Sequence, residues 1–179
     1  MTQVGSVYGE ALYELAKSEG LQESILEELK ALNESFRQEP GFIQLLSSHA
    51  ISKQERCKVL DDSFRGKINQ YVLNFLKILT EKGYMHHFSH CCEAYTRLYN
   101  EDNNILSVRA VTAVSLTETQ SQALTQKLTR LTGKTILLEN RVDPTCLGGV
   151  RLDYDGQRLD DTISHRLDSV RELLKNTVL

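Results

Sequence analysis

Three histidines and two cysteines fall within one short stretch, and they are the chain's best candidates for metal chemistry. His86, His87, His90, Cys91 and Cys92 offer the imidazole and thiolate ligands that zinc prefers. On a helix, however, His86 and His90 would share one face while His87 and Cys91 would share the next. Zinc needs three or four converging ligands, so two faces that point apart predict no metal site. We expect Cys91 in the core and the histidines at the surface.

Two other motifs resemble nucleotide-binding or catalytic sequences but fail on spacing. Gly133-Lys134-Thr135 matches the end of a phosphate-binding loop, yet Leu128 stands where that loop needs its first glycine. Such a loop also joins a strand to a helix, whereas we expect the reverse order here, with Gly133 as a helix C-cap. Ser164 and His165 are neighbours on a predicted helix and point in different directions, so they cannot pair as nucleophile and base. The sequence therefore predicts no catalytic, cofactor-binding or metal-binding residue.

The composition is that of an ordinary globular protein. Of 179 residues, 40% are hydrophobic and 25% are charged. The net charge of −3 argues against a nucleic-acid-binding protein, which would show a basic excess. Residues 1–104 hold 11 basic and 15 acidic side chains, and the remainder hold 10 and 9. Neither part predicts a basic patch for phosphates or anionic lipids.

The sequence predicts neither membrane insertion nor a disulfide framework. No run approaches the roughly 20 apolar residues that cross a bilayer. The N-terminal residues enter a helical pattern without the charged and apolar regions of a signal peptide. Cys57, Cys91, Cys92 and Cys146 show no disulfide spacing, and free thiols suit a reducing cytoplasm.

Apolar residues recur at helical spacing through residues 1–104 and predict a bundle of six helices. Gly20, Pro40-Gly41 and Gly83 mark the ends of helices, and the capping-box sequence Ser52–Glu55 opens the fourth helix. The last of the six runs to about Asn100. At Glu101–Asn104 the period becomes strand-like, and we place the domain boundary there. Two surfaces stand out in the bundle, the apolar stripes of its first and fifth helices. Such stripes are usually core, but small residues (Gly9, Ala11, Ala16) could leave a shallow groove for a partner's amphipathic helix.

Residues 105–179 predict a β-α-β-β-α order, a small mixed layer of helices on a sheet. The strands cover 105–114 and 135–142, and Thr117 opens the helix between them. Asp160 or Asp161 can cap a last helix with Ile163, Leu167, Val170 and Leu174 on one face. The predicted fold class is therefore α+β, with a helical bundle followed by a small α/β domain. About 75 residues bury only a modest core, so docking onto a partner would help this domain.

The most informative segment is a scaffold rather than a catalytic site. In Val142–Val150, Pro144 ends what precedes it, and Gly148-Gly149 lets the chain adopt a conformation closed to other residues. Asp155-Gly156 is a strong hairpin signal, and Asp143 suits turn chemistry.

This segment resembles the C-terminal signature of the delta subunit family of the F-type ATP synthase, whose mitochondrial member confers oligomycin sensitivity. Three further segments resemble the same family, in its order and spacing: Tyr8–Ala16, Asn74–Leu79 and Val111–Thr117. The resemblance therefore spans nearly the whole chain.

The resemblance implies a non-catalytic stator subunit, present once per complex. It would lie at the cytoplasmic face of the bacterial inner membrane, without inserting into it, and would join the catalytic alpha-beta head to the b-subunit peripheral stalk. Residues 1–104 would receive the N-terminal helix of an alpha subunit between the first and fifth helices, at Tyr8, Ala11, Leu12, Leu15, Asn74, Phe75, Leu76 and Leu79. Residues 105–179 would bind the C-terminal region of the b subunit through Leu147, Gly148, Gly149, Ile163, Leu167, Val170 and Leu174. No cofactor and no nucleic acid are implied.

Two alternatives stay open at the level of the sequence. One is a two-domain regulatory or ligand-binding adaptor unrelated to ATP synthase, which co-purification would separate from a stator subunit. The other is an enzyme that uses the histidine-cysteine stretch, which metal analysis would test.

Overall fold

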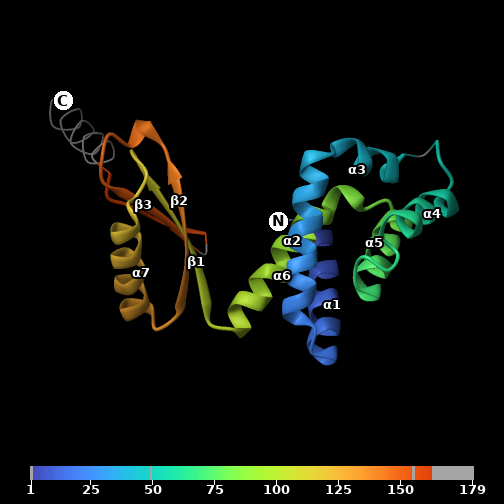
Figure 1. The fold of residues 1–179 in the computed structure, drawn as a ribbon, viewed down its shortest axis with the longest axis horizontal. Coiled ribbons are helices and arrows are strands. Elements are labelled where there is room, and N and C mark those ends of the chain that lie inside the picture. The colour runs from blue at the N-terminus through green and yellow to red at the C-terminus, as the bar shows by residue number, and fades with distance from the viewer. Residues whose placement is uncertain (1, 49, 155, 163–179) are drawn as a thin grey trace, which may run out of the picture. The chain divides into compact units, whose positions relative to one another are not determined.

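The chain has an α+β fold in which helices come first and a mixed sheet follows (Figure 1). The computed structural model describes residues 2–48, 50–154 and 156–162. The chain divides into two compact units, Met1–Tyr99 and Asn100–Leu179. This division lies in the last turn of a helix, whereas the sequence period changes a few residues later, after Asn104.

The helical unit is built from amphipathic helices joined by short connections. They are α1 (Gln3–Glu19), α2 (Gln22–Gln38), α3 (Pro40–Ser47), α4 (Lys53–Phe64), α5 (Gln70–Lys82), the 3₁₀ helix η1 (Met85–His87) and α6 (Phe88–Asp102). Ser52 and Glu55 form the predicted capping box. Gly20 and Gly83 end α1 and α5 with positive φ, as their positions predicted.

Two local expectations in this unit had different outcomes. The second helix ends at Gln38, just before Pro40-Gly41, as predicted, and Pro40 also occupies the first turn of α3, where a residue without an amide proton and with a fixed φ is well accommodated. The second expectation, on the histidines, was wrong. His86 and His87 lie in η1 rather than on one helix with His90, so the face assignment that we derived from α-helical spacing does not hold for them.

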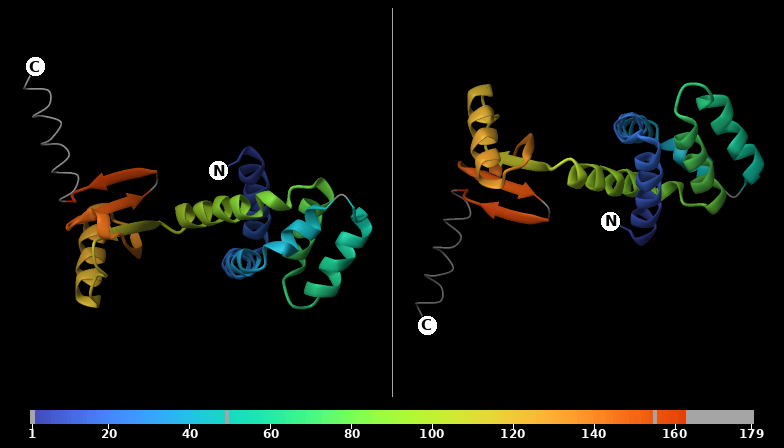
Figure 2. Two further views of the ribbon diagram at one scale, coloured as in Figure 1. Left: turned by 90° about the horizontal axis from the view of Figure 1, so that it is seen from above. Right: turned by 90° about the horizontal axis from the view of Figure 1, so that it is seen from below.

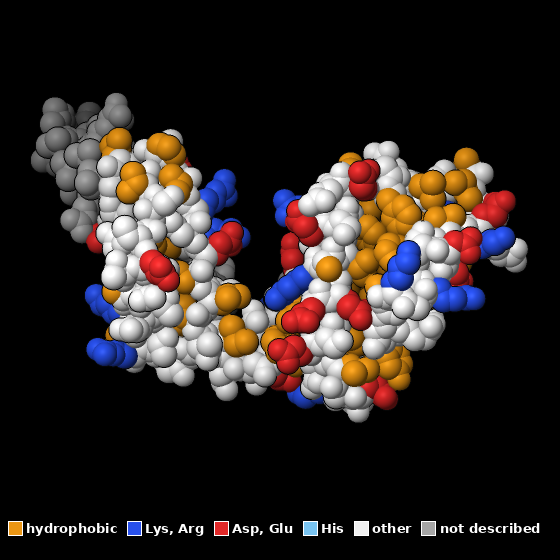
Figure 3. Space-filling view, viewed as in Figure 1, with side chains coloured by type: hydrophobic (Ala, Val, Ile, Leu, Met, Phe, Trp, Pro, Cys, Tyr) orange, Lys and Arg blue, Asp and Glu red, His pale blue; other side chains and the backbone are white. Residues whose placement is uncertain are grey.

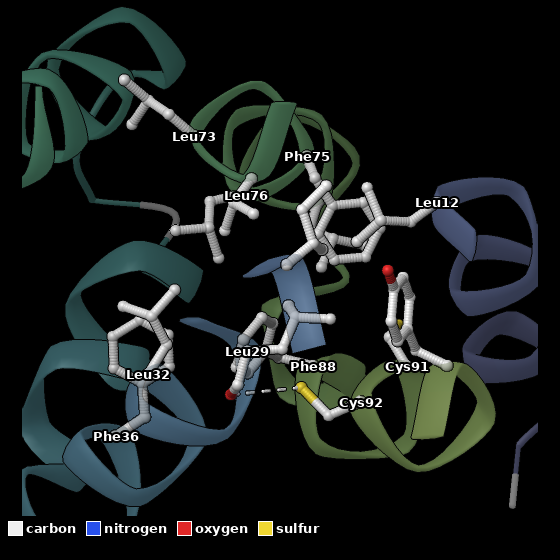
Figure 4. Close-up of a cluster of buried hydrophobic side chains, with 14 of the residues drawn as sticks. Leu12, Leu29, Leu32, Phe36, Leu73, Phe75, Leu76, Phe88, Cys91 and Cys92 are labelled. Atoms are coloured by element: carbon white, nitrogen blue, oxygen red, sulfur yellow. Dashed lines mark hydrogen bonds between the residues drawn. The ribbon is translucent and has the colours of Figure 1, made fainter. Parts of the chain in front are cut away.

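One continuous apolar core holds the helical unit together (Figure 4). Leu12 of α1 and Phe75 of α5 reach toward one another within it, and Phe36 of α2 packs edge-on against Phe88 of α6 with ring centroids 5.1 Å apart. Cys91 and Cys92 are both buried, and the Cys92 thiol donates to the Leu29 carbonyl oxygen over 3.8 Å. The cysteines thus behave as small core residues, as expected for Cys91.

The second unit contains a four-stranded mixed sheet and one described helix. Its elements are β1 (Ile105–Thr112), α7 (Glu118–Thr132), β2 (Thr135–Val142), the 3₁₀ helix η2 (Pro144–Cys146), β3 (Val150–Tyr154) and β4 (Gln157–Asp160). The strand order is β2-β1-β3-β4, with β1 parallel to β2 and the other neighbours antiparallel. β4 is a strand that the expected order did not count. It pairs Tyr154 with Gln157 across Gly156, which has a φ of 75°, so the predicted two-residue hairpin is confirmed.

Helix α7 lies on one face of the sheet (Figure 2). Thr117 and Gln120 form a capping box at its start, and Gly133 ends it with a φ of 69° before β2 begins. The helix-to-strand order at Gly133-Lys134-Thr135 excludes a phosphate-binding loop there. Among the described residues, Leu106, Val108 and Ile136 form a small buried cluster, and Ala110, Val111 and Cys146 are buried as well. The expected last helix, with Ile163, Leu167, Val170 and Leu174, and the Ser164-His165 pair lie outside the described residues.

Among the described residues, no helix is both long enough and apolar enough to cross a membrane.

Candidate protein-binding surfaces

Two contacts place α1 and α5 side by side and antiparallel. At one end, the rings of Tyr8 in α1 and Tyr84 just after α5 meet edge-on, with centroids 5.9 Å apart. At the other end, the negative charge of the Glu19 carboxylate raises the pKa of the Tyr71 phenol above the usual 10, and desolvation and a hydrogen bond from that phenol to Glu19 add to the shift. The resemblance implied a partner site along these two helices, and the fold brings them together.

The predicted residues of this site separate into core and surface. Leu12, Phe75, Leu76 and Leu79 are buried and belong to the core of the unit, beneath the surface of the two helices. Ala11, Leu15 and Asn74 are exposed, and Tyr8 is half-buried. Gly9 and Ala16 do not form a groove as expected. A Cβ on Gly9 would stand 2.5 Å from the Cys91 carbonyl oxygen and 2.8 Å from the Ala94 Cβ, so this part of α1 packs against α6 instead.

Two exposed apolar residues beside the predicted ones were missed. Val7 is 57% exposed and Ile78 is 45% exposed, and both are large aliphatic side chains. Helical spacing could have found them, because Val7, Ala11 and Leu15 form a second stripe next to the core stripe of α1, and Ile78 follows Asn74 by one turn. We call the side chains of Val7, Tyr8, Ala11, Leu15, Asn74 and Ile78 the α1–α5 face.

The second candidate surface lies at the carboxyl ends of β1 and β2. The amide of Asp143 donates to the Thr112 carbonyl oxygen over 2.8 Å, which holds the two strand ends together. Asp143 also accepts from the amide and hydroxyl of Thr145, at 3.0 and 2.6 Å, so its predicted turn role is confirmed. These hydrogen bonds lower the pKa of the Asp143 carboxyl. Three exposed aliphatic residues lie at or shortly after these strand ends: Val114, Val142 and Leu147. We call these three residues the strand-end patch. Figure 3 shows that apolar side chains are also exposed on the surface of this unit.

Leu147 is the unusual member of this patch. Its φ of 59° places it in the left-handed region, which costs a residue with a Cβ about 1–2 kcal/mol. Its side chain is nevertheless 65% exposed, so no packing within the described residues compensates for that strain. Strained backbone that the fold retains is typical of functional positions.

Gly149, one of the two glycines after Leu147, has a structural role in this unit. Gly149 has a φ of 81°, and a Cβ there would collide with the carbonyl oxygen of Asp161. Its missing side chain therefore lets the segment after β4 pass directly over β3. Thr162 is buried at that point and donates from its amide and hydroxyl to Asp160, at 3.1 and 2.7 Å. Gly149 positions the chain that leads into residues 163–179.

Two hollows of the surface lie among the described residues, and several of their charged side chains form ion pairs. A hollow of about 750 Å³ between α4 and α5 is lined mainly by charged side chains, together with Cys57. Burial and the nearby Glu81 carboxylate raise the pKa of the Cys57 thiol, which keeps it protonated and a poor nucleophile. Opposite it, a hydrogen bond from Lys77 lowers the pKa of Asp61, which also pairs with Arg65, so this carboxylate is neutralised by ion pairs.

The open face of the sheet is likewise occupied by ion pairs. A second hollow, of about 640 Å³, is lined by Arg109, Glu139, Asp153 and Arg158 among others. Arg109 pairs with Glu139 at 3.3 Å, and Arg158 with Asp153 at 2.9 Å. Within the described ranges, no three His, Cys, Asp or Glu side chains are grouped so that they could hold a metal ion. Burial raises the pKa of the Cys91 thiol to about 11 and that of Cys92 further still, so neither is poised as a thiolate ligand.

The described residues thus define a two-unit protein whose candidate sites are exposed apolar surfaces. The family described as ATP synthase delta (OSCP) subunit matches residues 4–174. An ATP synthase subunit delta from Alkaliphilus oremlandii is 32% identical over 176 residues, covering 98% of each chain. One from Clostridioides difficile is 30% identical over 176 residues, covering 98% of this chain and 97% of its own.

A solved structure has the same fold. A chain of the Toxoplasma gondii mitochondrial ATP synthase hexamer superimposes with a TM-score of 0.79 at 20% identity, covering 97% of this chain and 98% of that one. The chain belongs to the ATP synthase delta (OSCP) subunit family.

Proposed function

We propose that this protein is a non-catalytic stator subunit that joins the catalytic alpha-beta head of a bacterial F-type ATP synthase to its b-subunit peripheral stalk. The family match along residues 4–174 carries this proposal. A stator joint needs two separate binding surfaces and no reaction chemistry. The α1–α5 face and the strand-end patch lie on different units and fit that need. The subunit would act peripherally at the cytoplasmic face of the membrane, in one copy per complex.

In this proposal the α1–α5 face receives the N-terminal helix of an alpha subunit. The face offers aliphatic side chains of Val7, Leu15 and Ile78 flanking the small Ala11. An amphipathic helix that lies along two antiparallel helices buries apolar residues one turn apart, which is the spacing present here. Burial of apolar surface would supply most of the affinity, because it persists at physiological salt, where exposed ion pairs contribute little.

The second unit would bind the C-terminal region of the b subunit. The strained and exposed Leu147 is the described residue that most supports this role, since its backbone cost is understandable if the side chain inserts into a partner. Gly149 would act indirectly by setting the path of the chain after β4. The contacts proposed for Ile163, Leu167, Val170 and Leu174 rest on the family resemblance alone.

The test of the first contact is a titration with a synthetic peptide of the alpha subunit's N-terminus. We expect Ala11→Asp to weaken binding about tenfold or more, because the carboxylate would be desolvated without a partner. Ala31→Asp on α2 is a matched control, an identical change at an exposed helical position away from the face. Circular dichroism must show both variants folded. Unchanged affinity in folded Ala11→Asp, or equal losses in both variants, would exclude the α1–α5 face as the peptide site.

A further inference from the structure

The N-terminus of α1 is held by a cluster of imidazoles that the stator role does not explain. The rings of His86 and His87 lie 3.9 Å apart between centroids, and those of His87 and His90 lie 6.2 Å apart. Nδ1 of His87 is 3.3 Å from the hydroxyl oxygen of Thr2. Thr2 is the N-cap of α1, and the same oxygen accepts from the Gly5 amide over 3.2 Å.

This arrangement suits a neutral His87. The Thr2 hydroxyl uses a lone pair to cap the helix, so its proton is available for an unprotonated ring nitrogen. Protonation would turn Nδ1 into a second donor toward the Thr2 oxygen, beside the Gly5 amide, and the Thr2 hydroxyl proton would lose its acceptor. The α1 backbone also sits directly on His90, since a Cβ on Gly5 would be 2.5 Å from the His90 Cβ. Nδ1 of His90 is buried and makes no hydrogen bond to any described atom. A proton on His87 would therefore be poorly accommodated.

The elements that pack against His87 bring little to balance a positive charge. Within η1 and α6 its titratable neighbours are His86 and His90, and the Tyr84 ring lies 6.1 Å away. The first turns of α1 carry no charged side chain before Glu10, and α3, which packs on η1, carries none. The acidic side chains of the neighbouring helices interact with cysteines. Glu81, near the end of α5, accepts a hydrogen bond from the Cys57 thiol, and the charge of Glu93 in α6 contributes to the raised pKa of Cys92.

Two further effects oppose a charge at this place. Desolvation, together with repulsion from His86 and His90, lowers the pKa of His87 from its usual 6.5. The N-terminal end of a helix carries a partial positive charge, so an imidazolium beside the first turn of α1 is repelled by the helix as well. Acid therefore acts against the contact that holds α1 in place.

We propose that His87, packed between His86 and His90, forms with them an acid-sensitive clasp that releases the N-terminal turns of α1 when His87 gains a proton. The released part would include Val7 and Tyr8, and Tyr8 is also linked to the cluster through Tyr84. A consequence for the synthase rests on the proposed function, because Val7 and Tyr8 belong to the α1–α5 face. Mild acidification would then lower the affinity of the α1–α5 face for the alpha subunit.

The sign follows from proton linkage. A histidine whose pKa is lowered by folding binds its proton more tightly in the released state. The stabilisation of α1 by the clasp is fully present above the unperturbed pKa of 6.5, and it is lost as the pH falls from there through the lowered pKa of folded His87.

Amide hydrogen exchange of the full-length protein tests this directly. Between about pH 7.5 and about pH 5.5, where histidines change charge, exchange at residues 4–10 should speed up several-fold after correction for the intrinsic rate. Amides in the middle of α2 should not change. NMR titration should give His87 a pKa below the usual 6.5. Equal exchange of residues 4–10 at both pH values, or an unshifted His87, would overturn the clasp.

Two variants separate the charge from the shape of His87. Asn at position 87 keeps an acceptor near the place of Nδ1 but cannot titrate, so His87→Asn should remove the acid-induced exchange while keeping protection at neutral pH. His86→Asn removes one repelling charge and should only reduce the effect. A His87→Asn variant that still loosens on acidification would refute the assignment. If residues 4–10 of His87→Asn exchange fast at both pH values, His87→Gln supplies a second neutral acceptor. Exchange in His87→Gln that still speeds up on acidification would refute the assignment in the same way.

Peptide titration at the two pH values links the clasp to the α1–α5 face. Affinity for the alpha-subunit peptide should fall about threefold or more on acidification of the natural chain and stay constant in His87→Asn. Absence of peptide binding at every pH would reject the proposed alpha-subunit site and leave the exchange result to decide the clasp. If the peptide affinity is the same at both pH values although the amide exchange of residues 4–10 changes, the released turns do not contribute to the α1–α5 face.

Discussion

The described residues of the two units form apolar clusters of very different size. The helical unit has one continuous core with twenty buried residues, drawn from α1 to α6. The described part of the sheet unit has a cluster of three, Leu106, Val108 and Ile136, and no residue of α7 is fully buried. The helical unit can therefore present apolar residues outward without loss of its fold. The sheet unit, by contrast, carries exposed aliphatic residues beside a thin core, which is typical of a module completed by further contacts.

The largest expected effect compares the two cores by truncation. Leu76 is fully buried in the helical core, and Leu76→Ala should lower the free energy of unfolding of that unit by about 3–5 kcal/mol. Leu106→Ala in the thin core should cost about 2 kcal/mol, because fewer surrounding atoms lose contacts. Urea unfolding followed by NMR signals of each unit separates the two values, since the chain need not unfold in one step. Equal costs would contradict the contrast between a thick and a thin core.

A smaller effect concerns how tightly the helical unit is packed. Gly9→Ala should destabilise it by about 1–3 kcal/mol despite the better helix propensity of alanine, because the new methyl group would meet the backbone of α6. Gly41→Ala in α3 is the matched control. No atom lies within 4 Å of a Cβ at that position, so the substitution should stabilise by about 0.5–1 kcal/mol. Thermal unfolding of both variants gives the comparison. A neutral Gly9→Ala would show that α1 and α6 are not in close contact.

The smallest expected effect probes the strain in the sheet unit. Leu147→Gly relieves the positive φ and should raise the stability of that unit by about 1 kcal/mol, measured by urea unfolding. The same variant should bind the C-terminal region of the b subunit more weakly, because it loses the exposed side chain. A gain in stability together with a loss of affinity would fit a residue that is retained for partner binding. A loss of stability would indicate that Leu147 packs within its own unit.

Most local features could be predicted from residue types, because their causes are local. Gly20, Gly83 and Gly133 end helices since they tolerate positive φ, and Ser52 with Glu55 caps α4 through its own side chains. The hairpin at Gly156 is likewise a local feature, because a residue that tolerates positive φ is needed only at the turn itself. The short 3₁₀ geometry of His86 and His87 could not be read this way, because α-helical spacing and a tight turn give similar patterns over three residues.

The candidate surfaces were less predictable because they depend on which face of each helix meets a neighbour. The absence of a side chain at Gly9 allows α1 to pack closely on α6. The residues that it meets there, Cys91 and Ala94, are distant in the sequence, so the contact could not be predicted from local spacing. Leu76 and Leu79 belong to the core, whereas Ile78 between them points outward. The strain at Leu147 is a backbone property that residue type alone does not reveal.

The most direct test of the stator role asks whether the second unit transmits force. A fragment of residues 1–104 contains the whole helical core and should fold alone, as circular dichroism can verify. It should bind the alpha subunit and the catalytic head but not the b subunit. Membranes depleted of the natural subunit and rebuilt with this fragment should hydrolyse ATP without pumping protons, while the full chain restores both. If the fragment restores proton pumping as well as the full chain does, the second unit is not a mechanical link and the central claim is contradicted.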